Sequence, residues 1–358
     1  MQTVPRRILI VRPSALGDVC RTVPVLWSLR AAFPSATIDW VVEDTWSDAI
    51  RFHPALDSAI PFPKRALAAF WRHPRALWQS VQWGLDLRRR RYDLVIDAQG
   101  LARSGLMSLV SGASVRVGHR RAHEFSWLGA TLRVEGADSG HTVDRMLRLV
   151  EAIGVAPQHT MDLSVGAAHI EWWLAQRASR TIDRPYAVFA TANKWEGKRW
   201  ISSRWHALVA SIAGDLIAVG IHDLIWIGGP SERGQVADNT PDATSIAPLR
   251  SHDLSSETTV GGMMAIVKDA ALVVSLDSAP AHLAVGFNTP LVALYGATSV
   301  ATDGPYKQAA WCARGGSGDP PARHDYRDGA RGSALMARIG VDEVASLIRA
   351  RLQVRAKA

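Results

Sequence analysis

The sequence contains a turn that combines an anion-binding backbone with a carboxylate able to act as a base. It joins a short apolar run, Ile8–Val11, to an amphipathic stretch, Val19–Ala32, and consists of Arg12-Pro13-Ser14-Ala15-Leu16-Gly17-Asp18. A turn that opens a helix presents backbone N–H groups and the positive end of the helix dipole to an anion. Asp18 is then either a helix N-cap or a general base that takes a proton from a hydroxyl group. The turn contains neither G-x-G-x-x-G nor G-x-x-x-x-G-K-[ST], so a dinucleotide or P-loop site lacks its usual support.

A matching turn follows the apolar run Leu272–Ser275 in the second half of the chain. It consists of Leu276-Asp277-Ser278-Ala279-Pro280-Ala281-His282-Leu283-Ala284. Pro280 suits the first turn of a helix, because N–H groups there make no hydrogen bond within the helix and proline lacks an N–H. The N–H groups of Ser278, Ala279 and Ala281 would then face a pyrophosphate. His282 is either a ligand contact or an ordinary residue of the helix.

Two further polar segments follow apolar runs of the second half. Thr191-Ala192-Asn193-Lys194, with Lys198 close behind, follows one run, and Gly228-Gly229-Pro230-Ser231-Glu232 follows another. A lysine is a compact positive charge for a phosphate, and a glutamate accepts hydrogen bonds from ribose hydroxyls. Each segment alone is compatible with a solvated loop. Placed after successive strands, together they predict a nucleotide site at one edge of a sheet.

These turns must be positioned by short apolar strands that alternate with amphipathic helices. We expect strands at Ile8–Val11, Ile38–Val42, Leu94–Ile96, Val115–Val117, Ala187–Ala190, Leu224–Ile227, Leu272–Ser275 and Leu291–Leu294. We expect helices at Val19–Ala32, Gly105–Val110, Thr142–Ile153, Ser203–Ala213 and Val260–Lys268. Buried strands separated by helices predict parallel sheets, whose ligands bind at the carboxyl ends of the strands. The more polar stretch Gly154–Pro185 is the expected linker between two α/β halves.

Length and composition exclude several classes of protein. The 358 residues are long enough for two domains, and 47% hydrophobic with 21% charged residues excludes a disordered or collagen-like chain. Two cysteines, Cys20 and Cys312, exclude a disulfide framework and an all-cysteine zinc site. Apolar runs such as Ala270–Leu276 are too short to span a bilayer, and no signal-peptide core follows Arg6 and Arg7. The composition predicts a soluble protein of a reducing compartment.

The net charge of +8 is concentrated in residues 64–91. This segment contains eight Lys or Arg residues, opposed only by Asp86, and three of the 14 tryptophans. One interpretation is a surface for an anionic partner. The alternative is an amphipathic helix whose Leu77, Val81 and Leu85 face the core while the arginines are merely solvated. A nucleic-acid interface is a third possibility, but no nucleic-acid motif accompanies the cations.

Short segments in a fixed order and spacing resemble one known family from end to end. They are Ile8–Arg12, Ser14–Val19, Asp39–Glu43, Val95–Leu101, Lys198–Trp200, Gly228–Pro230, Val274–Ser278, Tyr295–Thr298, Gly304–Tyr306 and Met336–Leu352. The chain thereby resembles the ADP-heptose:lipopolysaccharide heptosyltransferases of glycosyltransferase family 9. Asp39–Glu43 and Ile96–Leu101 are most similar to the type I enzymes, which add the first heptose to the Kdo sugar of the inner core.

The resemblance implies an α/β protein of the GT-B fold, with two Rossmann-like domains whose parallel sheets face each other across a cleft. Residues 1–165 would form the acceptor-binding domain and residues 180–335 the ADP-heptose-binding domain. The C-terminal helix, residues 336–358, would pack back on the first domain.

The resemblance also implies roles for individual residues. Asp18 matches the proposed catalytic base of the family. The residues implied in donor binding are Asn193, Lys194, Lys198, Glu232, Leu254 (through its backbone), Asp277, Ser278, Ala279 and His282. The residues implied in acceptor binding are Ser14, Lys64, Arg65, Arg72, Arg75, Gln99 and His123.

The implied reaction is an inverting transfer in which Asp18 deprotonates the Kdo hydroxyl. Lys198 and the helix N-terminus at Ser278–Ala281 would stabilise the leaving ADP. No D-x-D pair occurs in the sequence, so we expect no metal and no cofactor besides the donor substrate, ADP-heptose. The expected partners are ADP-heptose and a Kdo-lipid A acceptor, with no nucleic acid. The expected location is the cytoplasm, peripheral to the inner membrane.

Three departures from the family pattern bear on the acceptor. Arg21 follows Cys20 where a histidine or another base is common, His123-Glu124 replaces an Arg-Glu pair, and the loop Gly315–Arg331 has no counterpart. Alternatives therefore include a sibling transferase that adds a later heptose or another sugar to a different acceptor. A GT-B nucleotide-sugar epimerase is a further alternative.

Overall fold

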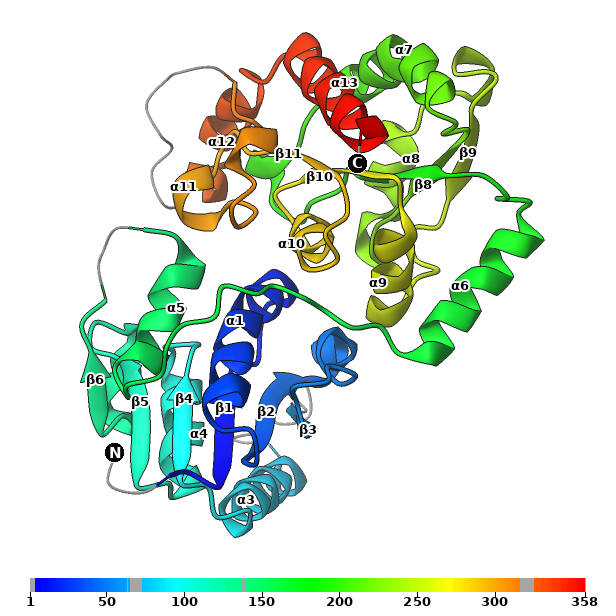
Figure 1. Cartoon of the computed structure of the whole chain (residues 1–358). Helices are drawn as coiled ribbons and strands as arrows, with labels where there is room; N and C mark the ends of the chain where they lie inside the picture. Colours follow the sequence, from blue (N-terminus) through cyan, green and yellow to red (C-terminus); the bar gives the residue numbers. More distant parts are fainter. Residues whose placement is uncertain (1–3, 63, 65–72, 137–139, 316–324, 358) are drawn as a thin grey trace. The chain divides into compact units, whose positions relative to one another are not determined.

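The computed structural model describes residues 4–62, 64, 73–136, 140–315 and 325–357. The chain divides into two compact units, the first ending at Ser164 and the second beginning at Val165. Each unit is an α/β layer structure built on its own parallel sheet (Figure 1).

The first unit contains a six-stranded parallel sheet in the order β3-β2-β1-β4-β5-β6. Its strands are β1 (Arg7–Val11), β2 (Thr37–Glu43), β3 (Ser58–Phe62), β4 (Leu94–Asp97), β5 (Val115–His119) and β6 (Leu132–Val134). Its helices are α1 (Leu16–Ala32), α3 (Pro74–Arg89), α4 (Ala102–Ser111) and α5 (Thr142–Glu151), with the short 3₁₀ segments η1 (Asp44–Ala49) and η2 (His123–Gly129). Helices α1 and α5 pack on each other, as do α3 and α4.

The second unit repeats this design with the strand order β12-β11-β10-β7-β8-β9. Its strands are β7 (Tyr186–Ala190), β8 (Asp223–Trp226), β9 (Arg250–Asp253), β10 (Leu272–Leu276), β11 (Leu291–Leu294) and β12 (Cys312–Ala313). Its helices are α6 (Ala167–Ser179), α7 (Ser202–Ala218), α8 (Arg233–Asn239), α9 (Val260–Asp269), α10 (Ala279–Gly286), α11 (Val300–Asp303), α12 (Gly329–Met336) and α13 (Val341–Lys357). Short 3₁₀ segments include η3 (Glu196–Lys198), η4 (Pro230–Glu232) and η7 (Asp325–Arg327).

The central strands are buried on both faces, and this burial explains their continuous apolar sequences. Ile8–Val11 of β1 have no exposed surface, and β1 pairs in parallel with β2 on one side and β4 on the other. In the second unit, the ring centroids of Phe189 and Trp226 lie 4.8 Å apart inside the core. Each sheet therefore holds its strand ends, and the turns that follow them, in fixed positions.

All eight expected strands are present, and the four that the sequence did not predict lie outermost in the two sheets: β3, β6, β9 and β12. An edge strand has less of its surface covered, so its sequence need not be continuously apolar. β9, for example, is Arg-Ser-His-Asp with no fully buried residue, and β6 is three residues long. The pattern that identifies a central strand is absent from such segments.

The two units divide between Ser164 and Val165, inside the expected linker Gly154–Pro185. This stretch also contains helix α6, whose buried Trp173 donates a hydrogen bond to the Tyr186 hydroxyl at 2.9 Å. The expected terminal helix Met336–Leu352 begins later than predicted, at Val341, because Met336 is the last residue of α12 and the chain turns before α13. A glycine, Gly340, directly precedes α13, and glycine is unfavourable inside a helix.

Helix α13 belongs to the core of the second unit. Val344 and Ile348 are buried in the same cluster as Leu208 and Ile212 of α7. The Nε of Arg349 also lies 2.7 Å from the Asp215 carboxylate of α7. The packing of this helix on the first domain, expected from the family resemblance, stays a prediction.

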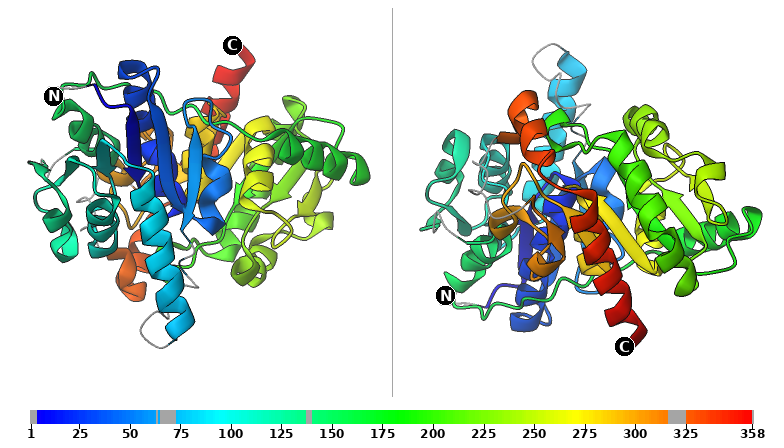
Figure 2. Two further views of the ribbon diagram at one scale, coloured as in Figure 1. Left: turned by 90° about the horizontal axis from the view of Figure 1, so that it is seen from below. Right: turned by 90° about the horizontal axis from the view of Figure 1, so that it is seen from above.

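Helix α3 contradicts the alternative in which Leu77, Val81 and Leu85 face the core. These side chains are 49%, 50% and 41% exposed. The core side of α3 instead carries Ala76 and Leu87, which are 7% and 2% exposed. The views of Figure 2 show α3 (light blue) on the outside of the first unit.

Candidate functional site

Asp18 lies in the first turn of α1, directly after the carboxyl end of β1. The N-cap of α1 is Ala15, and Asp18 is the third helical residue, so the interpretation of Asp18 as the N-cap was wrong. Its carboxylate still serves the helix start, because Oδ2 accepts a hydrogen bond from the Ala15 N–H at 3.4 Å. A quarter of the Asp18 side chain is exposed, which leaves room for a substrate hydroxyl.

Two arginines hold the Asp18 carboxylate. Nη2 of Arg12 lies 2.8 Å from Oδ2, and the Arg21 guanidinium pairs with Oδ1. Burial alone would raise the pKa of Asp18, but the charges and hydrogen bonds of Arg12 and Arg21 lower it far below its usual value. Asp18 is therefore a carboxylate at any working pH, and both arginines oppose its protonation.

The end of β4 is tied to this turn. The Arg12 guanidinium donates to the Ala98 carbonyl, and the Ser14 N–H donates to Oε1 of Gln99 at 3.2 Å. The buried Asp97 carboxylate orders the β4 turn by accepting hydrogen bonds from the N–H groups of Gln99 and Gly100, each at 3.0 Å. Two residues implied in acceptor binding, Ser14 and Gln99, are thus brought into contact.

In the described part of the chain, the other residues implied in acceptor binding make no direct contact with Ser14 or Gln99 among the interactions given below. Nζ of Lys64 lies 2.9 Å from the Glu43 carboxylate, and the Glu43 N–H donates to the Pro13 carbonyl at 3.0 Å, so Lys64 is held near the same strand ends. His123 is exposed, but its N–H donates to the Gly100 carbonyl at 3.0 Å. Arg75 is exposed at the start of α3. Arg65 and Arg72 lie outside the described residues.

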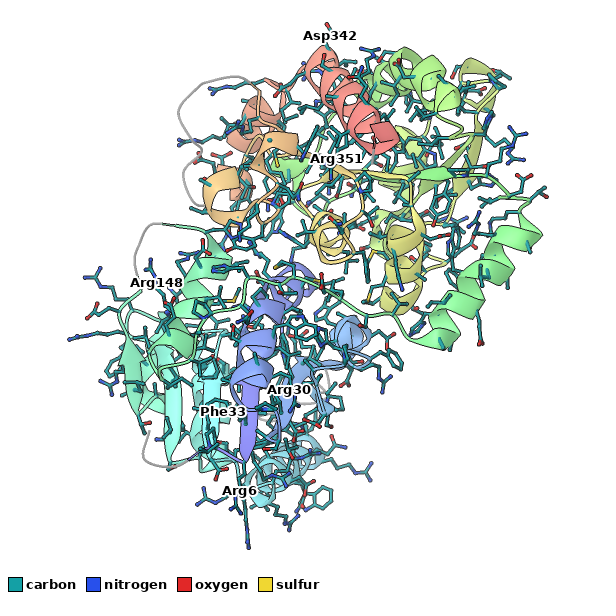
Figure 3. All side chains as sticks on the ribbon, in the orientation of Figure 1. Arg6, Arg30, Phe33, Arg148, Asp342 and Arg351 are labelled. Atoms are coloured by element: carbon teal, nitrogen blue, oxygen red, sulfur yellow. The ribbon has the colours of Figure 1, made fainter. Side chains whose placement is uncertain are left out.

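The pKa of His119, the last residue of β5, is affected by positive charges at the carboxyl edge of the first sheet. Burial, together with the nearby cations Arg145, Arg12 and Arg148, lowers the pKa of His119 to about 4. Figure 3 shows Arg148 on α5 and Arg6 at the opposite end of the strands, near the start of β1. Several cations therefore act at the carboxyl edge of the first sheet, as an anionic ligand would require.

In the second unit, Lys198 and Asp277 form a close ion pair. Nζ of Lys198 lies 2.5 Å from Oδ2 of Asp277, and the two side chains are 14% and 11% exposed. Nδ2 of Asn193 donates to the Asp277 carbonyl at 2.9 Å, and the Lys198 ammonium lies 4.2 Å from the centre of the Tyr326 ring. Two residues implied in donor binding from the segment after β7, Asn193 and Lys198, thus both contact a third, Asp277, which follows β10.

Helix α10 begins beside this pair. Its N-cap is Ser278 and Pro280 lies in its first turn, as the sequence predicts. The positive end of the helix dipole therefore lies next to Asp277 and Lys198. His282 is 3% exposed, so it is a buried residue of α10.

The remaining residues implied in donor binding follow β7, β8 and β9. Oε2 of Glu232 accepts from the Gly229 N–H at 2.9 Å, which fixes the carboxylate over its own turn. Leu254 is fully buried; its N–H already donates to the Trp226 carbonyl at 2.9 Å, and its carbonyl accepts from Glu257 at 3.2 Å. Lys194 is exposed, with its ammonium 5.1 Å from the Trp195 ring.

Sequence reasoning gave no role to several partners of the predicted residues. Arg12, Arg21, Glu43 and Tyr326 all contact a predicted site residue. Only the Asp18–Arg21 pair carries a local signal, the i, i+3 spacing of opposite charges on one helix. Arg12 lies in the same turn as Asp18, whereas Glu43 and Tyr326 come from segments distant from Lys64 and Lys198 and become visible as partners only when the chain is folded.

A separate pocket in the second unit does not coincide with these residues. It is lined by η3, the start of α7, α8 and α12, and its lining includes none of the residues implied in donor binding. In the described part of the chain, no three His, Cys, Asp or Glu side chains gather as metal ligands would.

Comparison with known proteins relates the chain to one family. Residues 81–327 match the model of Glycosyltransferase family 9 (heptosyltransferase). Lipopolysaccharide heptosyltransferase 1 of Pseudomonas aeruginosa is 28% identical over 323 residues, which cover 84% of this chain and 81% of that protein.

Two solved structures share the fold of both units. E. coli ADP-heptose lps heptosyltransferase II has a TM-score of 0.76 at 22% identity, covering 98% of this chain and 100% of that one. E. coli heptosyltransferase WaaC with ADP has a TM-score of 0.72 at 23% identity, covering 96% and 99%. The expected GT-B class with two Rossmann-like domains is thereby confirmed.

Proposed function

Because the chain belongs to glycosyltransferase family 9, the heptosyltransferases, we propose that it transfers heptose from ADP-heptose to a Kdo sugar of the lipopolysaccharide inner core. The enzyme class follows from the family. The donor, the acceptor and a place at the cytoplasmic face of the inner membrane are the proposal. The observation that carries it is the Asp18 carboxylate between Arg12 and Arg21 at the carboxyl edge of the first sheet.

The arginines suit an acceptor that carries its own carboxylate, as a Kdo sugar does. An incoming carboxylate competes with Asp18 for Arg12 and Arg21 and takes up part of their charge. The pKa of Asp18 then rises toward its usual value, because the two causes that lower it are weakened. The base thus becomes more basic when the correct acceptor is present, and it takes the proton of the attacking hydroxyl.

The second unit supplies the groups for the donor. Lys198 is held by Asp277 beside the N-terminus of α10, so a lysine cation and a helix dipole act on the same place. Both would stabilise the negative charge that develops on the leaving ADP. Glu232, whose Oε2 accepts from the Gly229 N–H in the turn after β8, would accept a hydrogen bond from the ribose.

The transfer is proposed to need no metal, since Lys198 and the α10 N-terminus already provide positive charge for the pyrophosphate. Dialysis against EDTA should leave the rate of transfer unchanged. Loss of transfer after EDTA, with recovery on addition of magnesium, would show that a metal takes part.

The direct test is transfer from ADP-heptose to Kdo2-lipid A by the wild type and by Asp18→Ala. Loss of the base should lower turnover by about 10²–10⁴-fold and leave the affinity for ADP unchanged. Asp44→Ala, which removes an exposed carboxylate at the end of β2, is the matched control and should retain activity. Equal activity of Asp18→Ala and Asp44→Ala would reject the assignment of the base.

A sibling transferase that adds a later heptose is the second candidate. The fold is shared with a solved type II enzyme as closely as with WaaC, so the fold does not separate the two acceptors. Parallel assays on Kdo2-lipid A and on the same acceptor already carrying one heptose separate them. Product formed only on the heptosylated acceptor would favour the sibling activity.

A further inference from the structure

Exposed apolar side chains are concentrated on one part of the first unit. Of the fifteen large hydrophobic side chains that are strongly exposed in the described part of the chain, eight belong to α3, α4 and η2. They are Leu77, Trp78, Val81, Leu85, Leu106, Leu109, Phe125 and Leu128. These residues are called the apolar face below. So large a group of exposed apolar residues is typical of a surface that binds a partner or a membrane.

The apolar-face residues of α3 lie on one stripe of the helix, as their spacing in the sequence shows. Leu77, Val81 and Leu85 follow each other at four-residue intervals, and Trp78, 64% exposed, lies next to them. The opposite side of the helix packs inward, where the Trp83 Nε1 donates to the Pro61 carbonyl at 3.1 Å. Helix α3 is therefore amphipathic, with an apolar stripe that no described element of its own unit covers.

The stripe continues onto α4 and η2. A methyl group on Gly84 would lie 3.2 Å from the Val110 side chain, so α3 and α4 touch there. A methyl group on Gly105 would lie 2.5 Å from the Ser126 carbonyl oxygen, so α4 and η2 touch on the other side of α4. At 100° per residue, Leu106 and Leu109 point outward between these two contacts. The apolar face thus extends across three neighbouring elements.

Cations border this face. Arg75, Arg88 and Arg89 lie on α3, Arg103 on α4, and Arg133 lies 4.6 Å from the Trp127 ring of η2. These five arginines outnumber the two acidic residues of α3, α4 and η2, of which Asp86 pairs with Arg89 at 2.7 Å and Glu124 accepts from the Ala102 N–H at 3.1 Å, so the border is positive overall. An apolar surface with a basic border is complementary to an anionic lipid bilayer, whereas a second copy would bring the same positive charges together.

We propose that the apolar face docks the first unit on the surface of an anionic membrane. Trp78 and Phe125 enter the boundary between headgroups and acyl chains, and the bordering arginines contact lipid phosphates. The described part of the chain has no helix with the length and apolar content needed to cross a bilayer, so the contact is a surface contact. The proposal rests on the proposed function in one respect: it brings the acceptor unit to a sugar that is anchored in a lipid.

The test is sedimentation of the full-length protein with vesicles of phosphatidylethanolamine and phosphatidylglycerol. The variant Leu77→Ser/Trp78→Ser/Val81→Ser should bind these vesicles at least about tenfold more weakly, because it removes three side chains from the lipid boundary. Leu174→Ser/Ile201→Ser, which changes two exposed apolar residues of the second unit, is the control and should bind like the wild type. Vesicles of phosphatidylcholine alone, and Arg88→Gln/Arg89→Gln, test the contribution of charge and should both weaken binding.

Transfer to a water-soluble, deacylated Kdo acceptor separates this proposal from the proposed function. The triple serine variant should keep the wild-type kcat/KM on that acceptor while it loses vesicle binding. Vesicle binding by the triple variant at the wild-type level would overturn the docking surface, even if transfer is confirmed. A wild type that ignores vesicles and forms dimers, which the triple variant converts to monomers, would assign the face to a second copy instead.

Discussion

Asp18 acts in the first unit as the centre of a group of three charges with Arg12 and Arg21. These two ion pairs make Asp18 a weak base, because they stabilise the carboxylate relative to its protonated form. An acceptor that carries a carboxylate relieves the pairing, whereas water does not. If Asp18 is the proposed base, this pairing would favour transfer to an anionic sugar over hydrolysis of the donor.

Arg21→Gln should raise the rate of donor hydrolysis relative to transfer to the acceptor. With one cation removed, the pKa of Asp18 rises and the carboxylate becomes a better base toward water. We expect faster release of ADP from ADP-heptose without acceptor, and a higher KM for the Kdo acceptor. Release of ADP with and without acceptor measures both effects. Arg51→Gln breaks an exposed i, i+3 pair with Asp48 and is the control. Unchanged hydrolysis and unchanged acceptor KM in Arg21→Gln would contradict the role of Arg21.

His119 should make the stability of the protein depend on pH. Its folded pKa of about 4 lies below the usual value near 6.5, so between these values the unfolded chain binds the extra proton. The contribution of neutral His119 is complete above about pH 6.5 and is lost as the pH falls to about 4. His119→Gln should flatten the fall in Tm over this range in thermal unfolding. His206→Gln, at an exposed site, should show the wild-type slope.

Lys198 and Lys194 provide a matched comparison for donor binding. Lys198→Ala removes the cation held by Asp277 and should lower transfer by about 10²–10³-fold. Lys194→Ala removes an exposed lysine and should cost less than about tenfold. Lys198→Ala/Asp277→Ala removes the carboxylate that would otherwise stay unpaired, so it should recover Tm without recovering transfer. Equal rates for the two single variants would show that Lys198 has no special role.

At the scale of elements, the packing of α4 on η2 depends on two glycines. A methyl group on Gly105 would meet the Ser126 carbonyl oxygen at 2.5 Å, and one on Gly129 would overlap the Gly105 carbonyl oxygen. Contacts this short can be relieved only by moving backbone. The same elements carry part of the apolar face and, through His123, reach the turn after β4, so their spacing affects both surfaces.

Gly105→Ala should therefore destabilise the protein, by about 1–3 kcal/mol. Gly214 lies on the exposed side of α7, and an alanine methyl group there would have no neighbouring atom within 4 Å. Gly214→Ala should therefore stabilise the folded protein by about 0.4–1 kcal/mol. Urea unfolding of both variants measures the two changes in the free energy of unfolding. Stabilisation by both variants would mean that intrinsic helix propensity, and not the contact with η2, decides the effect at Gly105.

For the whole molecule, most of the net charge of +8 comes from residues 64–91, and α3, in the described part of that segment, carries half of the apolar face. Charge at a surface is screened by salt, whereas a buried ion pair such as Lys198–Asp277 is screened much less. Salt should therefore affect the two substrates differently.

Raising the concentration of NaCl should increase the KM for an acceptor embedded in anionic vesicles and change the KM for ADP-heptose much less. The physical reason is that docking on the bilayer depends on exposed arginines. Initial rates at several salt concentrations, with vesicle-bound and with deacylated acceptor, measure the effect. The same salt dependence for both acceptors would place the sensitive charges in the sugar site and not on the docking surface.

Local sequence patterns are enough to predict the central strands, the two turns and the class of fold. Continuous apolar runs such as Ile8–Val11 are needed wherever a strand is covered on both faces, and Pro280 and Ser278 specify a helix start through local backbone requirements. These signals depend on a few adjacent residues, so they can be read without the tertiary structure. The family resemblance gave Asp18 and Lys198 the roles proposed above.

The folded chain was needed to show which groups hold those residues and which surface of α3 is exposed. Arg12 reaches Asp18 through a turn, and Lys198 meets Asp277 across 79 positions of sequence. Leu77, Val81 and Leu85 have the spacing of a core stripe, yet they are exposed because α3 packs inward through Ala76, Trp83 and Leu87. An amphipathic pattern shows that a helix has an apolar side, but the neighbouring elements determine whether that side is covered.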